Sequence, residues 1–146
     1  DLGRRFWIEA RGGQPVRITD CQIRTSKTEA DFGGAFTDIS QVDIFGCSIY
    51  YPRDIIFTRC AFTGCGLELH PDAMIAEFTA TGQSIEFIDC TFVGSGPAAV
   101  YNYGQVTGSG RTNTVKFTRC TYSGFDAGYV LRNGFTGTLV GSLPHA

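Results

Sequence analysis

The sequence predicts an all-β protein built as a solenoid, and three observations carry this prediction. The segment "IIFTRCAFTG" (Ile55–Gly64) recurs as "IEFIDCTFVG" (Ile85–Gly94) and "VKFTRCTYSG" (Val115–Gly124), each thirty residues after the last. Nineteen glycines and the lack of long helix-forming runs favour strands and turns. Polar loops recur between the copies at nearly equal offsets. Such a fixed period is typical of a β-solenoid, whose coils bury their apolar faces against one another.

Residues 1–11, "DLGRRFWIEAR", are the candidate N-terminal cap, because a short solenoid needs covers at its ends and this segment carries an apolar run. After it the frame apolar-x-apolar-x-x-Cys-x-apolar recurs, and its period-two alternation makes each half a strand with one buried face. The break before each cysteine shifts the alternation, which predicts a bend between two short strands. The frame fits five times, with its cysteines at Cys21, Cys47, Cys60, Cys90 and Cys120.

The spacing between the cysteines is uneven in the first half of the chain. Cys21 and Cys47 lie twenty-six residues apart, whereas Cys47 and Cys60 lie only thirteen apart. Thirteen residues are short for a coil with three sides, so we expect a truncated coil or a hairpin near residues 44–56. Residues 135–146 read as a loose C-terminal end. An open end suits a homotrimer or the continuation of a longer β-helix.

Aligning the copies places like residues in columns. These columns are Phe57/Phe87/Phe117, Phe62/Phe92/Tyr122 and Cys60/Cys90/Cys120. Together with the recurring strands and bends, they resemble the right-handed parallel β-helix of the pectate-lyase-like superfamily, whose coils carry such internal ladders. The resemblance covers most of the chain and implies a short right-handed parallel β-helix of about five coils. It is a resemblance of fold and extends to no catalytic motif.

The six cysteines do not follow the pattern of a disulfide framework, although a short chain with six cysteines invites that interpretation. Five occupy one repeated position, and Cys65 alone falls outside it. Cysteine is small and apolar enough to fill a bend in coil after coil, so we expect a buried, reduced column. Disulfides are the second interpretation, and zinc is the third because the chain has no Cys-x-x-Cys pair. Neither a metal nor another cofactor is expected.

Composition and charge narrow the classes of partner. The chain suits one domain, 1–146, and its net charge of −2 provides no basic surface for nucleic acid. No apolar run reaches the roughly 20 residues of a spanning helix, so membrane insertion is not expected. The arginine pair beginning at Arg4 and "DIS" at Asp38 also resemble the PilZ domain, a cyclic-di-GMP-binding barrel, but the D-x-S-x-x-G motif fails at Asp43. A barrel would also leave the period of thirty unexplained.

Charged residues beside the cysteines form columns of alternating sign. Arg59, Asp89 and Arg119 occupy one outward column, and Glu86 and Lys116 form a second pair. Exposed ion pairs contribute little stability each, so we interpret both sets as structural.

A polar strip recurs between the copies and is the candidate site. "LELHPD" (67–72), "AVYNYG" (99–104) and "VLRNG" (130–134) fall at nearly equal offsets, which predicts that they lie side by side. Carboxylates, tyrosines and arginines are groups that bind sugars. The predicted catalytic residues are Glu68, His70, Tyr101 and Arg132, and the predicted ligand-binding residues are Asp72, Asn102, Tyr103 and Asn133. The alternative interpretation is that these segments are plain turns, with Pro71 as a turn former.

The function predicted first is recognition of polysaccharide by a β-helix module of an adhesin, a phage tailspike or a fibre, in an extracellular or virion-surface location. The alternative is a carbohydrate-active enzyme that uses the same strip. In a polysaccharide lyase, Tyr101 or His70 would remove the proton next to a uronate, and Arg132 would neutralise the uronate carboxylate. A glycoside hydrolase needs two carboxyl groups, which Glu68 and Asp72 would supply. A self-assembling scaffold of the bactofilin type is the weaker alternative, because bactofilin coils are shorter than these.

Overall fold

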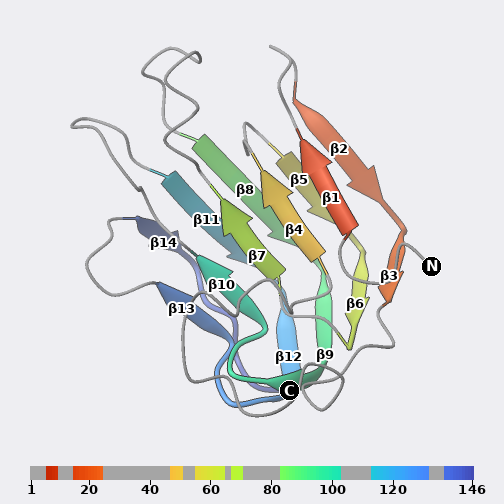
Figure 1. Cartoon of the computed structure of the whole chain (residues 1–146), viewed down its shortest axis with the longest axis vertical. Coiled ribbons are helices and arrows are strands. Elements are labelled where there is room, and N and C mark those ends of the chain that lie inside the picture. The colour runs from red at the N-terminus through yellow and green to blue at the C-terminus, as the bar shows by residue number, and fades with distance from the viewer. Residues whose placement is uncertain are drawn as a thin grey trace.

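The computed structural model describes residues 6–9, 15–24, 47–50, 55–64, 67–70, 83–102, 113–131 and 137–146. Within these residues the chain forms strands and no helix, which confirms the all-β prediction (Figure 1). The strands make three sheets, here called sheets A, B and C.

Each sheet gathers strands that lie far apart in the sequence. Sheet A has the order β1 (Phe6–Glu9), β4 (Cys47–Tyr50), β7 (Leu67–His70), β10 (Val100–Asn102) and β13 (Tyr129–Leu131). Sheet B has the order β14 (Thr138–Val140), β11 (Asn113–Thr118), β8 (Gln83–Ile88), β5 (Ile55–Thr58) and β2 (Val16–Thr19). Sheet C has the order β12 (Thr121–Phe125), β9 (Thr91–Gly96), β6 (Ala61–Thr63) and β3 (Gln22–Arg24).

The chain visits the three sheets in one cyclic order. Strands β1, β2 and β3 lie in sheets A, B and C, and this order repeats through β13 and β14. All strand pairs in the described residues are parallel. Parallel neighbours need a long crossover, and here the strands of the other two sheets supply it. The arrangement is compatible with a β-helix, and Figure 1 shows successive passes of the chain side by side.

The apolar columns predicted from the repeat form the core. The rings of Phe57, Phe87 and Phe117 stack in turn, with centroids 5.2 and 5.3 Å apart and interplanar angles of 7° and 13°. Phe62 and Phe92 form a second stack, 4.8 Å apart at 8°. Rings of the two stacks meet edge to face, the geometry that the quadrupole of an aromatic ring favours. All five rings are buried, so the period of thirty determines which side chains touch.

The predicted bend lies between sheets B and C, directly before each column cysteine. Asp20, Arg59, Asp89 and Arg119 occupy it with φ of 56°, 51°, 54° and 52°. This left-handed conformation is rare for residues with a Cβ, and it turns the chain within one residue. The backbone ladder continues through the bend, because the Arg59 N–H donates to the Ile88 carbonyl at 2.8 Å and the Asp89 N–H donates to the Thr118 carbonyl at 2.9 Å.

Cys47 does not belong to the cysteine column, which corrects the frame predicted around it. It opens β4 in sheet A, in register with Phe6 and Leu67. A hairpin near residues 44–56 is likewise wrong for the described strands there, because β4 pairs within sheet A and β5 pairs within sheet B. The spacing of thirteen residues to Cys60 is short because the two cysteines lie on different sides of the same pass.

The segments expected at the ends are both part of sheets where the structure describes them. Residues 6–9 of the candidate cap form β1, which extends sheet A by one parallel strand. Residues 137–146 were expected to be loose, yet β14 pairs with β11 and His145 bridges Tyr122. Backbone hydrogen bonds to the preceding pass hold this segment in place. Such bonds could not be predicted from a Gly- and Pro-containing sequence, because backbone groups do not depend on the side chain.

Candidate functional site

Sheet A brings the polar strip together through its register. Glu68 in β7 is the register partner of Tyr101 in β10, and Tyr101 is in turn the partner of Val130 in β13. Ser48 in β4 precedes Glu68 in the same row. Successive side chains of a strand point to opposite faces, and the neighbours of Tyr101 within β10 are buried. Tyr101 itself is partly exposed, so this row runs along the outer face of sheet A.

His70 lies at the end of β7, two positions after Glu68. Its register partner is Tyr50 in β4. Two strand positions keep the same parity, so His70 falls in the row next to that of Glu68 and Tyr101. Sheet A therefore places the positions of three of the four predicted catalytic residues, Glu68, His70 and Tyr101, in two adjacent rows.

Asn102 lies inside the protein and not on the outer face. Its relative exposure is 0%, and its Nδ2 donates a hydrogen bond to the Tyr129 hydroxyl at 2.8 Å. Burial raises the pKa of Tyr129, which keeps this phenol neutral. The Asn102 side chain therefore points away from the row that contains Tyr101, because strand parity places the two on opposite faces of sheet A. The other predicted site residues, Arg132, Asp72, Tyr103 and Asn133, lie outside the described residues.

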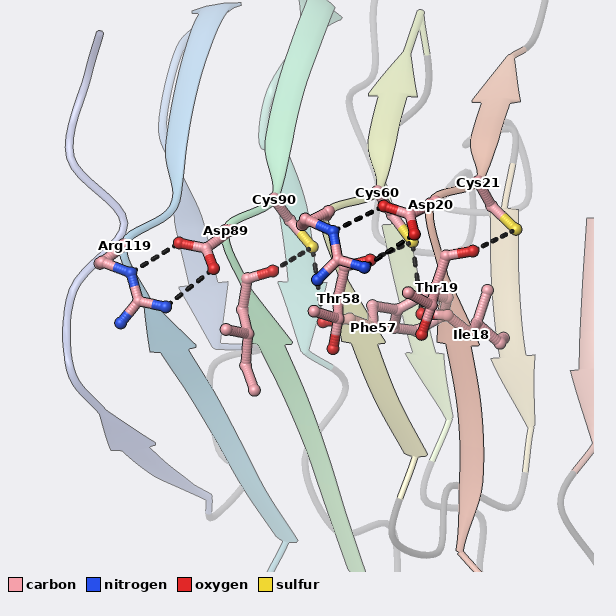
Figure 2. A network of polar contacts seen from close by, with 12 residues as sticks. Ile18, Thr19, Asp20, Cys21, Phe57, Thr58, Cys60, Asp89, Cys90 and Arg119 are labelled. Carbon is pink, nitrogen blue, oxygen red and sulfur yellow. Dashed lines mark hydrogen bonds and ion pairs between the residues drawn. The ribbon is translucent and has the colours of Figure 1, made fainter.

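A ladder of ion pairs runs along the bend between sheets B and C (Figure 2). The Nε and Nη2 atoms of Arg119 donate to the two carboxylate oxygens of Asp89 at 2.6 and 2.8 Å. Arg59 makes the same two-pronged contact with Asp20 at 2.6 and 2.7 Å. The column predicted from Arg59, Asp89 and Arg119 thus begins one pass earlier, at Asp20. That residue could have been found from the sequence, because it also directly precedes a cysteine of the frame.

The ladder shifts the titration of its acids. Hydrogen bonds from Arg59 and Arg119 hold the pKa of Asp20 and of Asp89 below the ordinary value of 3.8. All four side chains are more than a third exposed, so solvent screens the attraction. The second predicted pair is also present on sheet B, where Lys116 Nζ lies 3.0 Å from Glu86 Oε1. These contacts join neighbouring passes at the surface, which agrees with the structural interpretation of both sets.

The cysteine column is a ladder of free thiols on the inner side of the same bend. Cys60, Cys90 and Cys120 are buried and unbridged, whereas Cys21 is exposed and also free. The single S–H of each buried cysteine is within hydrogen-bond distance of two acceptors, the carbonyl two residues earlier and a carbonyl of the preceding pass. Cys21 donates to Thr19 alone among the described acceptors, because sheet order places β2 and β3 at the edge.

Burial and the hydrogen bond between neighbouring cysteines set the chemistry of these thiols. Burial raises the pKa of Cys60, and the hydrogen bond with Cys120 together with burial raises the pKa of Cys90. The same hydrogen bond lowers the pKa of Cys120 to about 7. At Cys60 and Cys90 the raised pKa means little thiolate, which is the reactive form. Among the residues that the structure describes, no three His, Cys, Asp or Glu side chains gather as metal ligands would. The ladder is thus a packing element, and the prediction of a buried column is confirmed for three of its members.

Comparison with protein-family models, with curated proteins and with solved structures finds no match to this chain. The fold and the rows described above therefore define its class: an all-β protein of three parallel sheets with repeated passes. No helix in the described part of the chain has the length and apolar character needed to cross a membrane.

Proposed function

We propose that this chain is a short right-handed parallel β-helix of about five coils that recognises polysaccharide on the outer face of sheet A. The cyclic order of the sheets supports the β-helix. The hand follows from the general preference, since parallel strands joined by a crossover are right-handed in nearly all proteins.

The observation that carries the binding proposal is the register of Glu68 with Tyr101. Parallel neighbours lie about 4.8 Å apart, so the Glu68 position and the partly exposed ring of Tyr101 adjoin on one face of sheet A. Sugars present apolar ring faces and hydroxyl groups, which tyrosine rings and carboxylates bind respectively. A row that runs across several strands suits a polymer better than a small molecule, which prefers a concave pocket. Within this proposal the protein serves as a module of an adhesin, a tailspike or a fibre outside the cell or on a virion.

The first experiment is a glycan-array screen of the purified chain, repeated with two variants of one residue. Tyr101→Ala removes the ring, and Tyr101→Phe keeps the ring but removes the hydroxyl. Thr118→Ala, on the outer side of sheet B, is the control for a surface change elsewhere. We expect binding by the wild type and the control, with a loss of about tenfold or more for Tyr101→Ala. Binding by no glycan, or equal binding by Tyr101→Ala, would contradict the proposal.

The enzyme alternative is tested in the same samples. Bound glycans are incubated with the protein and examined for new reducing ends and for the absorbance of unsaturated products. Turnover that Glu68→Gln abolishes while binding persists would assign a reaction to this row. Binding without turnover would support recognition alone. If the protein binds no glycan on the array and forms filaments that depend on its concentration, the result would instead favour the self-assembling scaffold.

A further inference from the structure

The segment Gly141–Ala146 crosses the edge of sheet C at β12. The Tyr122 N–H donates to the Pro144 carbonyl at 3.0 Å, and the Ala146 N–H donates to the Tyr122 carbonyl at 2.8 Å. Both backbone groups of Tyr122 that face this edge are thereby used. The His145 ring also meets the Tyr122 ring edge to face, with centroids 5.1 Å apart. The segment is therefore attached through backbone and side chain alike.

The segment reaches this place by one sharp turn. β14 pairs with β11 for three residues, and then Gly141 adopts a φ of 80°. A Cβ at Gly141 would overlap the carbonyl oxygen of Phe117, so the backbones approach more closely here than any other residue type allows. Leu143 follows and packs against the buried cluster that contains Phe117. The turn thus brings a small apolar side chain against this buried cluster.

The edge strand β12, which this segment covers, is complementary to the edge at the other end of the sheets, formed by β2 and β3. In the part of the chain that the structure describes, β3 pairs with β6 alone and β2 pairs with β5 alone. Because the described strand pairs are all parallel, β3 of a second copy could add to β12, and β2 of that copy could add to β11 in place of β14, in the direction that each sheet already has. In that register Ile23 of the second copy would follow Phe62, Phe92 and Tyr122, the inward positions of sheet C. The inner column would continue with an apolar residue.

The charges on the bend fit the same stacking. The ladder starts with Asp20 and ends with Arg119, and its sign alternates at each step. With its β2 in the place that β14 holds on β11, a second copy in register would bring its own Asp20 beside Arg119, which is 67% exposed. Opposite charges would therefore meet at the junction, and the alternation would continue across it. A head-to-tail contact of this kind does not close on itself, so it would lead to fibres.

We infer that Thr138–Ala146 is a cap that occupies, within one chain, the edges of sheets B and C at β11 and β12, to which β2 and β3 of a second copy would otherwise add. Unpaired strand edges promote association, and natural proteins block them with short strands, prolines and covering segments. This segment combines all three devices: β14 has three residues, Pro144 has no N–H to offer, and the chain covers Tyr122. The cap keeps copies of the protein from stacking head to tail. Without the cap, the parallel strand direction and the alternating charges of the ladder would favour such stacking.

The test displaces the cap without shortening the chain. Gly141→Val places a branched side chain where even a Cβ overlaps Phe117, and Ser142→Ala is the matched control at the exposed neighbouring position. Molar mass is measured by light scattering across a range of protein concentrations and salt concentrations. Circular dichroism reports whether each variant is folded. Hydrogen exchange at the Tyr122 amide and at the amides of β14 reports whether the cap has been released.

We expect the wild type and Ser142→Ala to keep one mass, and Gly141→Val to at least double its mass with concentration while it stays folded. Salt should weaken the association, because the junction pairs Arg119 with Asp20. Adding Ser123→Lys, a charge on the edge strand β12, should restore the lower mass. If Gly141→Val does not fold, Leu143→Asp releases the cap more gently. A released cap with unchanged mass, or stacking of the wild type through β12, would overturn the inference.

Discussion

The stacked phenylalanines allow a quantitative test of what the repeat contributes to stability. Phe87 lies at the centre, with no exposed surface. Its ring stacks on Phe57 and Phe117 and meets Phe62 and Phe92 edge to face, which makes four ring contacts. An aromatic pair contributes about 0.5–1.5 kcal/mol beyond the burial of its area. Four such pairs would sum to about 2–6 kcal/mol, and because neighbouring contacts are not additive we expect the lower half of that range.

The change that isolates this term is Phe87→Leu, compared with Phe125→Leu. Phe125 is also buried but forms no ring pair with another described residue, so both variants lose the same atoms. The free energy of unfolding is measured by urea titration with linear extrapolation. We expect Phe87→Leu to lose about 2–3 kcal/mol more than Phe125→Leu. A difference below about 0.5 kcal/mol would refute the reasoning, because the column would then act through burial alone.

Three further predictions concern polar groups and thiols. Tyr129→Phe should lower the free energy of unfolding by about 1–3 kcal/mol, because the Asn102 amide loses this hydrogen-bond partner. In a double-mutant cycle measured by urea unfolding, Tyr129→Phe combined with Asn102→Leu should lose less than the sum of the two single variants. The pKa of Asp89 is lowered in the folded state, so its contribution is present above the ordinary value of 3.8 and is lost as pH falls through the lowered pKa. Asp89→Asn should therefore flatten the acid limb of the stability profile, and an unchanged limb would contradict this. In the native protein Cys21 should react with a thiol reagent about tenfold or more faster than Cys90, as peptide mass spectrometry would show, whereas equal rates would exclude a buried column.

The ion ladder shows which contacts a sequence repeat predicts and which it does not. Arg59, Asp89 and Arg119 were predicted to share a column, and they do. Which neighbour each arginine contacts could not be predicted, because Arg59 is flanked by an acid on both sides. The structure pairs it with Asp20, whose pKa Arg59 lowers through a direct hydrogen bond. Column membership follows from spacing, but partner choice depends on side-chain rotamers.

The candidate site shows the same limit. The offsets predicted that the strip containing Glu68 would lie beside the strip containing Tyr101, and the register of sheet A does this. The offsets did not tell that Asn102 would turn inward, since a turn-like "YNYG" gives no clear alternation. The strand β10 decides it, because Val100 and Asn102 share the buried parity and Tyr101 takes the other.

By itself the sequence determined the period, the all-β class, the parallel stacking of Phe57, Phe87 and Phe117, and the bend before each column cysteine. These follow from local alternation and from a repeat long enough to align one pass with the next. The tertiary structure alone decided that Cys47 lies in sheet A and that Gly141–Ala146 covers the edge at Tyr122. Both depend on backbone hydrogen bonds between distant segments, and every residue except proline offers the same backbone groups, so the sequence carries no mark of which segments will pair.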